Sequence, residues 1–283
     1  MSLDFGEVLD SAIAAFGPLC VGIDPHAFIL EEWGLPQSAE GALELGLRVV
    51  SATAEHVGVV KPQVAFFERF GSAGYAALER VLAEARAAGL IVVADAKRGD
   101  IGSTLAGYAE AWLTPGSPLE ADAVTVYAYQ GVGSIAELLE YAVAGGKGAF
   151  VVTATSNPEA AAIQQARLAD GRTVARAILD DVTAFNANVE GAGLLGPVGV
   201  VLGATLDLAA FGIDTGTPPH PALPVLAPGF GAQGASITEL RRIYGALAPR
   251  TLVHESRGIL TAGPKDIGAA IAGRAAEVRA ALG

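Results

Sequence analysis

The sequence has few of the residues that most often bind metals or form covalent crosslinks. Its 283 residues include one cysteine and four histidines. The single cysteine, Cys20, cannot form an internal disulfide, and we expect it to be a small buried hydrophobic residue. The histidines have no metal-ligand spacing, so they predict no metal site. One of them, His254, is expected to be a packed residue in the last strand.

Basic residues are also scarce, and long apolar runs are missing. Lysine and arginine number 18 against 30 aspartates and glutamates, which gives a formal net charge of −12. Such an acidic chain lacks the basic surface that binds nucleic acid, so no nucleic-acid partner is expected. No apolar run reaches the length of a membrane span, and the acidic start MSLDFGEVLD differs from the basic-then-apolar pattern of a signal peptide. We therefore expect a cytoplasmic protein with no membrane partner.

The chain does contain a regular alternation of short apolar runs and longer helical segments. Runs that are nearly continuous in Val, Ile and Leu are typical of parallel strands covered by helices. Strands are expected at residues 18–24, 56–61, 90–95, 121–126, 148–153, 197–202, 224–227 and 251–255. Helices are expected at about 38–54, 71–88, 103–113, 131–143, 172–190, 205–210, 236–247 and 264–281.

Eight such units, with a short helix ahead of them, predict an α/β fold of the (β/α)₈ TIM-barrel class. Barrels of this class commonly reach ~250 residues as one unit. No segment has the composition of a linker, so we predict a single domain over residues 1–283. A doubly wound open sheet is the alternative.

The segment 91–104, IVVADAKRGDIGST, combines a buried strand pattern with a sudden cluster of charges. Side chains alternate along a strand, so Asp95 and Lys97 are expected on the same face. Burying two opposite charges is costly unless they pair. Taken alone, an Asp-x-Lys pair is more often a structural ion pair than a reactive site. The other strand ends change that balance.

Polar residues follow several of the other predicted strands. Asp24 ends the first strand, Lys61 ends the second, Ser156 follows the fifth and Arg257 follows the eighth. In (β/α)₈ barrels the chemistry takes place at the carboxyl ends of the strands. The sequence therefore predicts that these side chains gather around one site.

The loop after the seventh strand, residues 228–234 (PGFGAQG), matches the glycine pattern G-x-G-x-x-G. Glu255 lies about twenty residues further on, which formally completes a dinucleotide fingerprint. A dinucleotide-binding fold needs several strands after this loop, whereas only one is expected here. A barrel instead predicts a phosphate site formed by the loops after strands seven and eight, with Gln233 and Arg257 as its side chains.

Together these residues resemble the orotidine 5'-phosphate decarboxylases, in particular their longer bacterial branch (type 2). The motifs that carry the resemblance span most of the chain, and their order and spacing make it specific. They are CVGIDPH (20–26), VKPQVAFFE (60–68), DAKRGDIGST (95–104), ATSNP (154–158), APGFGAQG (227–234) and SRGIL (256–260).

The resemblance implies a homodimer that converts orotidine 5'-monophosphate to UMP and CO₂ in de novo pyrimidine biosynthesis, without metal or cofactor. It implies that Lys97 protonates the C6 carbanion and that Asp95 lies beside the substrate carboxylate. Loss of CO₂ leaves an electron pair on C6 that needs a cation and a proton, and a lysine can supply both. Asp100, Ile101 and Thr104 are expected to reach into the partner subunit's site.

The resemblance also assigns the residues that hold the rest of the nucleotide. Asp24 and Lys61 are expected to bind ribose hydroxyls and to complete an alternating charge network. Ser156 is expected to face the pyrimidine ring. Gln233 and Arg257 are expected to bind the phosphate, and Pro228, which opens their loop, is counted among the substrate-binding residues.

Three other functions fit parts of the pattern. A metal-dependent decarboxylase or aldolase of sugar phosphates would use Asp95 as a ligand of Mg²⁺. A nicotinamide oxidoreductase would use the glycines of 229–234, and a barrel that only binds phosphate would catalyse nothing. The sequence Ser-Asn-Pro at 156–158 and the Arg-Gly after Lys97 favour the nucleotide enzyme.

Overall fold

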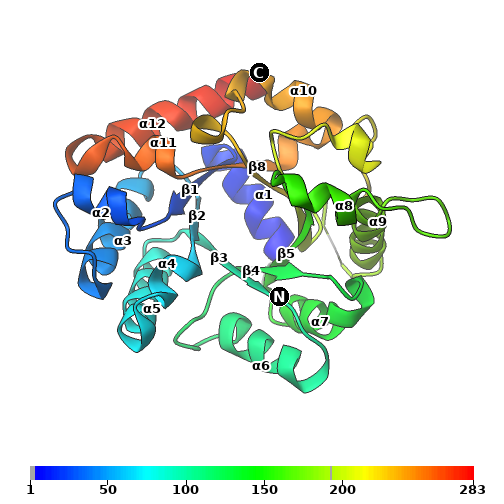
Figure 1. Cartoon of the computed structure of the whole chain (residues 1–283), viewed down its shortest axis with the longest axis horizontal. Coiled ribbons are helices and arrows are strands. Elements are labelled where there is room, and N and C mark those ends of the chain that lie inside the picture. Colours follow the sequence, from blue (N-terminus) through cyan, green and yellow to red (C-terminus); the bar gives the residue numbers. More distant parts are fainter. Residues whose placement is uncertain (1–3, 192) are drawn as a thin grey trace.

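The computed structural model describes residues 4–191 and 193–283 and forms a closed barrel of eight strands (Figure 1). Each strand pairs in parallel with its neighbours in sequence, and β8 closes the ring on β1. The strands are β1 (Leu19–Ile23), β2 (Val59–Pro62), β3 (Ile91–Arg98), β4 (Ala123–Tyr127), β5 (Gly148–Ala154), β6 (Val198–Leu202), β7 (Val225–Pro228) and β8 (Thr251–Glu255). The predicted (β/α)₈ barrel is confirmed, and the open sheet is excluded.

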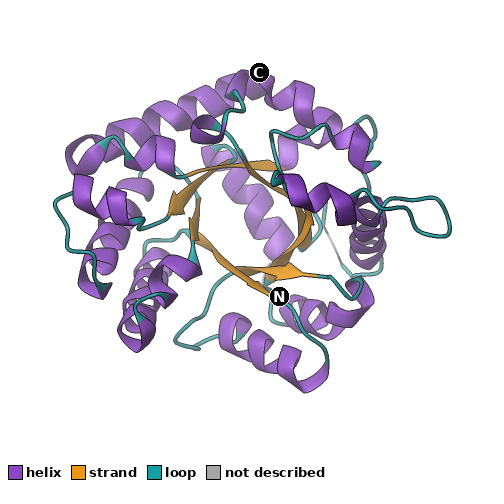
Figure 2. Cartoon of the chain, viewed as in Figure 1, coloured by secondary structure: helices purple, strands orange, loops and turns teal. Residues whose placement is uncertain are grey.

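Helices surround this ring of strands, as Figure 2 shows. The longer ones are α3 (Ala39–Thr53), α5 (Gly71–Ala87), α6 (Gly102–Leu113), α7 (Ala136–Ala144), α9 (Val174–Ala187) and α12 (Gly263–Leu282). The shorter ones are α2 (Ala27–Glu32), α4 (Val64–Glu68), α8 (Ala161–Gln164), α10 (Leu240–Tyr244) and α11 (Arg257–Leu260). Residues 1–3, part of the start considered above for a signal peptide, and residue 192 lie outside the described residues. Among the residues described, no helix has both the length and the hydrophobicity of a membrane span.

The N-terminal helix α1 (Phe5–Phe16) covers the end of the barrel where the strands begin. A capping box starts it, because the Asp4 side chain accepts from the Glu7 N–H and the Glu7 side chain accepts from the Asp4 N–H. Phe5 packs edge-on against Phe150, and a Cβ at Gly148, the first residue of β5, would overlap its ring. With this end closed, the carboxyl ends of the strands remain open for a site.

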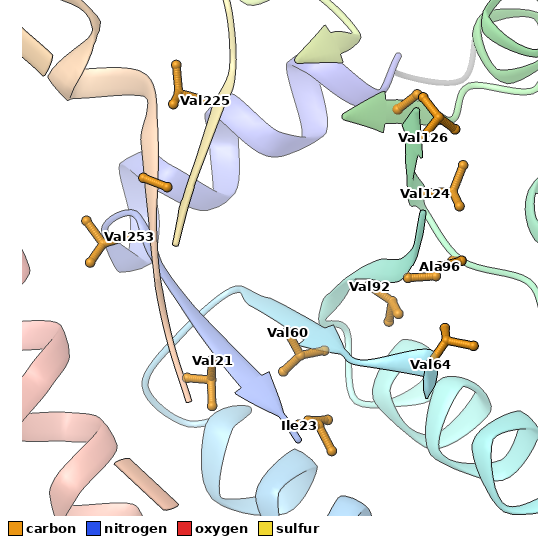
Figure 3. Packing of buried hydrophobic residues seen from close by; sticks show 14 of the residues in the cluster. Val21, Ile23, Val60, Val64, Val92, Ala96, Val124, Val126, Val225 and Val253 are labelled. Carbon is orange, nitrogen blue, oxygen red and sulfur yellow. The ribbon is translucent and has the colours of Figure 1, made fainter. Parts of the chain in front are cut away.

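Alternating side chains of the strands divide the core into two layers. The inner layer fills the barrel and includes Cys20, Val59 and Leu252. The outer layer packs against the helices and includes Val21 and Val60, which Figure 3 shows among other outward-facing residues. Cys20 is fully buried, as expected, and burial raises the pKa of its thiol to about 12.

The main departures from the predicted elements are in the helices. The helices expected at 131–143 and 236–247 are not continuous: the first opens with a 3₁₀ turn (Val132–Ile135), and the second consists of a 3₁₀ turn (Ile237–Glu239) followed by α10. Gly245, with a φ of 50°, ends α10. The helix expected at 205–210 is a 3₁₀ turn at Leu208–Phe211. The helices α2, α4 and α11 are too short for a helical hydrophobic period to reveal them.

Candidate active site

The centre of the site is Asp95 on β3, a buried carboxylate that accepts four side-chain hydrogen bonds. Its Oδ2 accepts from Lys61 Nζ at 2.7 Å and from Gln63 Nε2 at 2.9 Å. Its Oδ1 accepts from Lys97 Nζ at 2.5 Å and from Thr125 Oγ1 at 2.9 Å. Burying an unpaired carboxylate costs several kcal/mol, so these four donors stabilise the ionised form.

The backbone at Lys97 departs from a regular strand. Its φ is 48°, and Lys97 is the one non-glycine residue with a positive φ in the described part of the chain. The pairing of β3 with β4 shifts register between Ala94 and Arg98, which is the mark of a β-bulge. Thr125 Oγ1 accepts from the backbone N–H of Lys97 at 2.9 Å and so fixes this conformation. Such a residue costs about 1–3 kcal/mol, and strain of this kind concentrates at functional sites.

The charges of the cluster reinforce one another. Burial alone would raise the pKa of Asp95, but Lys61 and Lys97 outweigh it and hold that pKa well below its usual range. Burial alone would lower the pKa of Lys61, but Asp95 and then Asp24 outweigh it and raise that pKa. The order Asp24, Lys61, Asp95, Lys97 is therefore an alternation of acidic and basic side chains along the site, with Lys61 and Asp95 each stabilised in the charged form.

Two adjoining cavities open at the carboxyl ends of the strands. The first, of about 270 Å³, is lined by the charged cluster and by further residues from β5 to β8, among them Ser156, Pro228, Gln233 and His254. The second, of about 370 Å³, is lined by residues that include Ser256 and Arg257. Asp24, Gln63, Gln233 and His254 border both cavities. The structure thus brings Asp24, Lys61, Asp95, Lys97, Ser156, Pro228, Gln233 and Arg257 to one continuous site.

The other three predicted site residues lie apart from these cavities. Asp100, Ile101 and Thr104 form the corner between β3 and α6 and line neither cavity. Asp100 Oδ1 accepts from the Ile101 N–H at 2.9 Å, and the Ile101 side chain is 58% exposed. These side chains point to a surface of the subunit and not to its own site.

The glycines of the 228–234 loop are required by its shape. Gly229, Gly231 and Gly234 all have φ values between 64° and 119°, where other residues are strained. A Cβ on Gly231 would lie 2.3 Å from Glu255 Oε1 on β8. The loop can therefore lie directly over β8, which brings Gln233 and Arg257 to the same cavity.

The residues that line the site include several that the sequence did not predict as site residues, among them Gln63, Thr125 and His254. Gln63 and Thr125 donate to Asp95, and His254 borders both cavities. The prediction that His254 is a buried residue of the last strand is correct, but its position in the cavity wall was not foreseen. Strand alternation carried the signal, because Leu252 faces the barrel interior and His254 lies two residues further on.

Comparison with known proteins identifies the family of this chain. Residues 17–270 match the family model described as orotidine 5'-phosphate decarboxylase / HUMPS family. The chain is 49% identical to the orotidine 5'-phosphate decarboxylase of Salinispora tropica, over 98% of each chain. It is 47% identical to that of Corynebacterium glutamicum, over 93% of this chain and 92% of the relative.

Solved structures give the same result. A putative orotidine 5'-phosphate decarboxylase from Streptomyces avermitilis superposes with a TM-score of 0.92 at 49% identity, over 100% of this chain and 97% of the other. The OMP decarboxylase of Leishmania donovani superposes with a TM-score of 0.76 at 31% identity, over 99% of both. The chain belongs to the orotidine 5'-phosphate decarboxylase / HUMPS family.

Proposed function

We propose that this protein decarboxylates orotidine 5'-monophosphate to UMP and CO₂ in de novo pyrimidine biosynthesis. Relatives at 47–49% identity carry the name of this activity. The observation that carries the proposal is the ionised Asp95, held between Lys61 and Lys97 in a cavity that continues to Arg257. Purified protein incubated with the nucleotide should release one CO₂ for each UMP formed. Failure to release CO₂ while still binding UMP would instead favour a silent phosphate-binding barrel.

The charge cluster supports a direct mechanism. An ionised Asp95 beside the substrate carboxylate disfavours the bound ground state, and departure of CO₂ relieves that repulsion. The C6–carboxylate bond breaks and its electron pair stays on C6. The ammonium of Lys97 stabilises this negative charge and then transfers its proton to C6. Lys97 regains a proton from solvent, to which its side chain is 38% exposed.

The remainder of the nucleotide is held away from the reacting carbon. Asp24 and Lys61 are proposed to bind ribose hydroxyls, and Ser156 to face the pyrimidine, since all three line the cavity that contains Lys97. Gln233 and Arg257 are proposed to bind the phosphate, for which a forked guanidinium is well suited, and both line the adjoining cavity. Binding energy from a distant phosphate accelerates the reaction when it is expressed in the transition state.

The protein is further proposed to act as a homodimer with shared sites. Gly99 lies against Tyr127, so the corner at Ile101 is continuous with the end of β4. Tyr127 and Tyr129 are 45% and 81% exposed, which gives this corner an apolar surface that a second copy can cover. Asp100, Ile101 and Thr104 would then reach the partner's site. Sedimentation that shows a monomer at assay concentrations would contradict this arrangement.

The reaction is proposed to need no metal or cofactor. Both oxygens of Asp95 already accept from two donors each, which leaves this carboxylate poorly placed to bind Mg²⁺. Within residues 4–191 and 193–283, no group of three or more His, Cys, Asp or Glu side chains is placed to hold a metal ion. Loss of activity on chelation, restored by Mg²⁺, would favour the metal-dependent sugar-phosphate enzyme.

Residues 1–283 are proposed to form a single catalytic domain that works in the cytoplasm. The support for this is the continuous match to biosynthetic relatives over 98% of the chain. Fractionation of cells that express the tagged protein tests the location, and recovery of the activity with membranes would contradict it.

A further inference from the structure

The residues that line the two cavities include buried polar atoms that find no hydrogen-bond partner within the described chain. Two of these atoms are the carboxylate oxygens of Glu255, which forms an ion pair with Arg274. The others are Asp24 Oδ1, His254 Nε2 and Ser256 Oγ. The three residues are 9%, 9% and 7% exposed. Buried polar atoms are nearly always hydrogen-bonded, so a group of unpaired ones at a cavity wall indicates a bound partner.

Gly22 on β1 brings two of these side chains together. A Cβ at Gly22 would lie 2.7 Å from His254 Nε2 and 2.5 Å from the Cβ of Ser256. The missing side chain of Gly22 therefore leaves the space into which His254 and Ser256 lean from the end of β8. This arrangement keeps both polar groups beside Asp24, which lies two residues after Gly22 and lines the same cavity.

His254 and Ser256 lie between the proposed ribose-binding residues and the proposed phosphate-binding residues. His254 borders both cavities, and Ser256 borders the one that contains Arg257. Lys61 lines only the cavity that contains Lys97, Arg257 lines only the other, and the proposed ribose-binding Asp24 and phosphate-binding Gln233 border both. An oxygen that joins a sugar to its phosphate would pass this wall.

The electrostatics of His254 and Ser256 also favour binding of such an uncharged oxygen. Burial, and next the positive charge of Lys61, hold the pKa of His254 well below its usual range, although Asp95 acts in the opposite direction. Lys97 adds a smaller effect in the same direction as Lys61, and Asp24, Glu255 and Arg257 are the other charged residues that line the cavities bordered by His254. A neutral imidazole and a hydroxyl can each donate a hydrogen bond without disturbing the alternating charges. Uncharged ester and ring oxygens accept such bonds.

We propose that His254 and Ser256 form a subsite that binds the sugar–phosphate linkage of the nucleotide, between the ribose-binding and phosphate-binding groups. This inference rests on the proposed function, because it takes the nucleotide as the substrate. It adds a contact that neither Lys97 nor the phosphate-binding residues supply.

The test measures the binding of two ligands, UMP and inorganic phosphate, by two variants. His254→Leu removes the hydrogen bond at similar volume, and Ser256→Ala removes only the hydroxyl. UMP binding, measured by calorimetry, should weaken about tenfold in His254→Leu and about threefold in Ser256→Ala. Effects of this size are expected for the loss of one hydrogen bond. Inhibition by inorganic phosphate should remain unchanged in both, because Gln233 and Arg257 are intact. His56→Leu, a histidine that lines neither cavity, is the matched control.

The two ligands distinguish loss of this subsite from general damage to the binding cavity. UMP affinity equal to that of the wild type in both variants would overturn the proposal. Equal weakening of UMP and of phosphate would also overturn it, because it would indicate such general damage. If His254→Leu does not fold, Ser256→Ala alone decides by the same two measurements. A wild-type protein that releases no CO₂ from orotidine 5'-monophosphate would instead refute the proposed function.

Discussion

Two buried charge clusters, at opposite ends of the same barrel, contain the same kinds of residue but differ in their surroundings. At the carboxyl ends of the strands, Asp95 lies between Lys61 and Lys97. At the amino ends, Glu120 Oε1 pairs with Lys147 Nζ at 2.8 Å and its Oε2 pairs with Arg86 at 2.6 Å. Both carboxylates have pKa values below the usual range, despite burial that acts in the opposite direction.

The difference lies in strain and in access. The Glu120 cluster precedes β4 and β5 and borders neither of the two cavities of the site. The Asp95 cluster borders a cavity of the site. Its member Lys97 has a strained backbone conformation, with a φ of 48°. A structural ion pair does not require such strain, so buried opposite charges alone do not identify an active site.

The largest effect is expected for Lys97→Ala. Removal of the proton donor should reduce decarboxylation by about a thousandfold or more, while thermal unfolding shows that the fold is kept. Lys61 remains to pair with Asp95 in this variant. The measurement is kcat from the loss of substrate absorbance. Retention of a tenth of the wild-type rate would refute the assignment of Lys97.

Arg257→Ala should act on binding more than on chemistry. Loss of charge-assisted hydrogen bonds to the phosphate should raise KM by about 10- to 100-fold. Arg48→Ala, which removes an exposed arginine paired with Glu44 on α3, should leave KM unchanged. An unchanged KM for Arg257→Ala would show that the phosphate binds elsewhere.

Lys147→Met tests the other cluster. It leaves Glu120 buried with one cation fewer, so the free energy of unfolding should fall by about 3 kcal/mol at pH 7. The pKa of Glu120 is lowered in the folded protein, so the stability from this pair is present above its unfolded value of about 4.3 and is lost as the pH falls through the folded value. The variant and wild type should therefore converge in acid.

Urea denaturation at several pH values measures this difference. Lys265→Met, at an exposed lysine of α12, is the control and should cost little. Normal kcat/KM is expected for Lys147→Met. A large loss of activity without loss of stability would remove the distinction between the two clusters.

The smallest signal is expected from mixed dimers. Asp100→Ala and Lys97→Ala subunits, each nearly inactive alone, should regain up to about one quarter of wild-type activity after random exchange, because half of the dimers then contain one intact site. The measurement is activity after unfolding and refolding of an equal mixture. No recovery, in mixtures shown to contain mixed dimers, would exclude a site that is shared between subunits.

The sequence predicted the barrel and most of the site because both depend on simple periodicity. All eight strands lie where the apolar runs place them, and polar residues at their ends meet because parallel strands end at the same rim. The β-bulge at Lys97 could not be predicted from the sequence. A regular strand would also place Asp95 and Lys97 on one face, so the sequence pattern required no irregularity there. The contact of Thr125 with Asp95 depends on which strands are neighbours and at what register, which local sequence does not contain. Alternation places His254 in the cavity wall only once Leu252 is known to face the barrel interior.

The most direct test of the central claim is decarboxylation by wild-type protein freed of metal with a chelator. We expect the absorbance of orotidine 5'-monophosphate to fall at the same rate before and after this treatment, with release of CO₂ and formation of UMP. Loss of activity on chelation, with recovery on addition of Mg²⁺, would contradict a site whose chemistry is carried out by Lys97 and Asp95 alone.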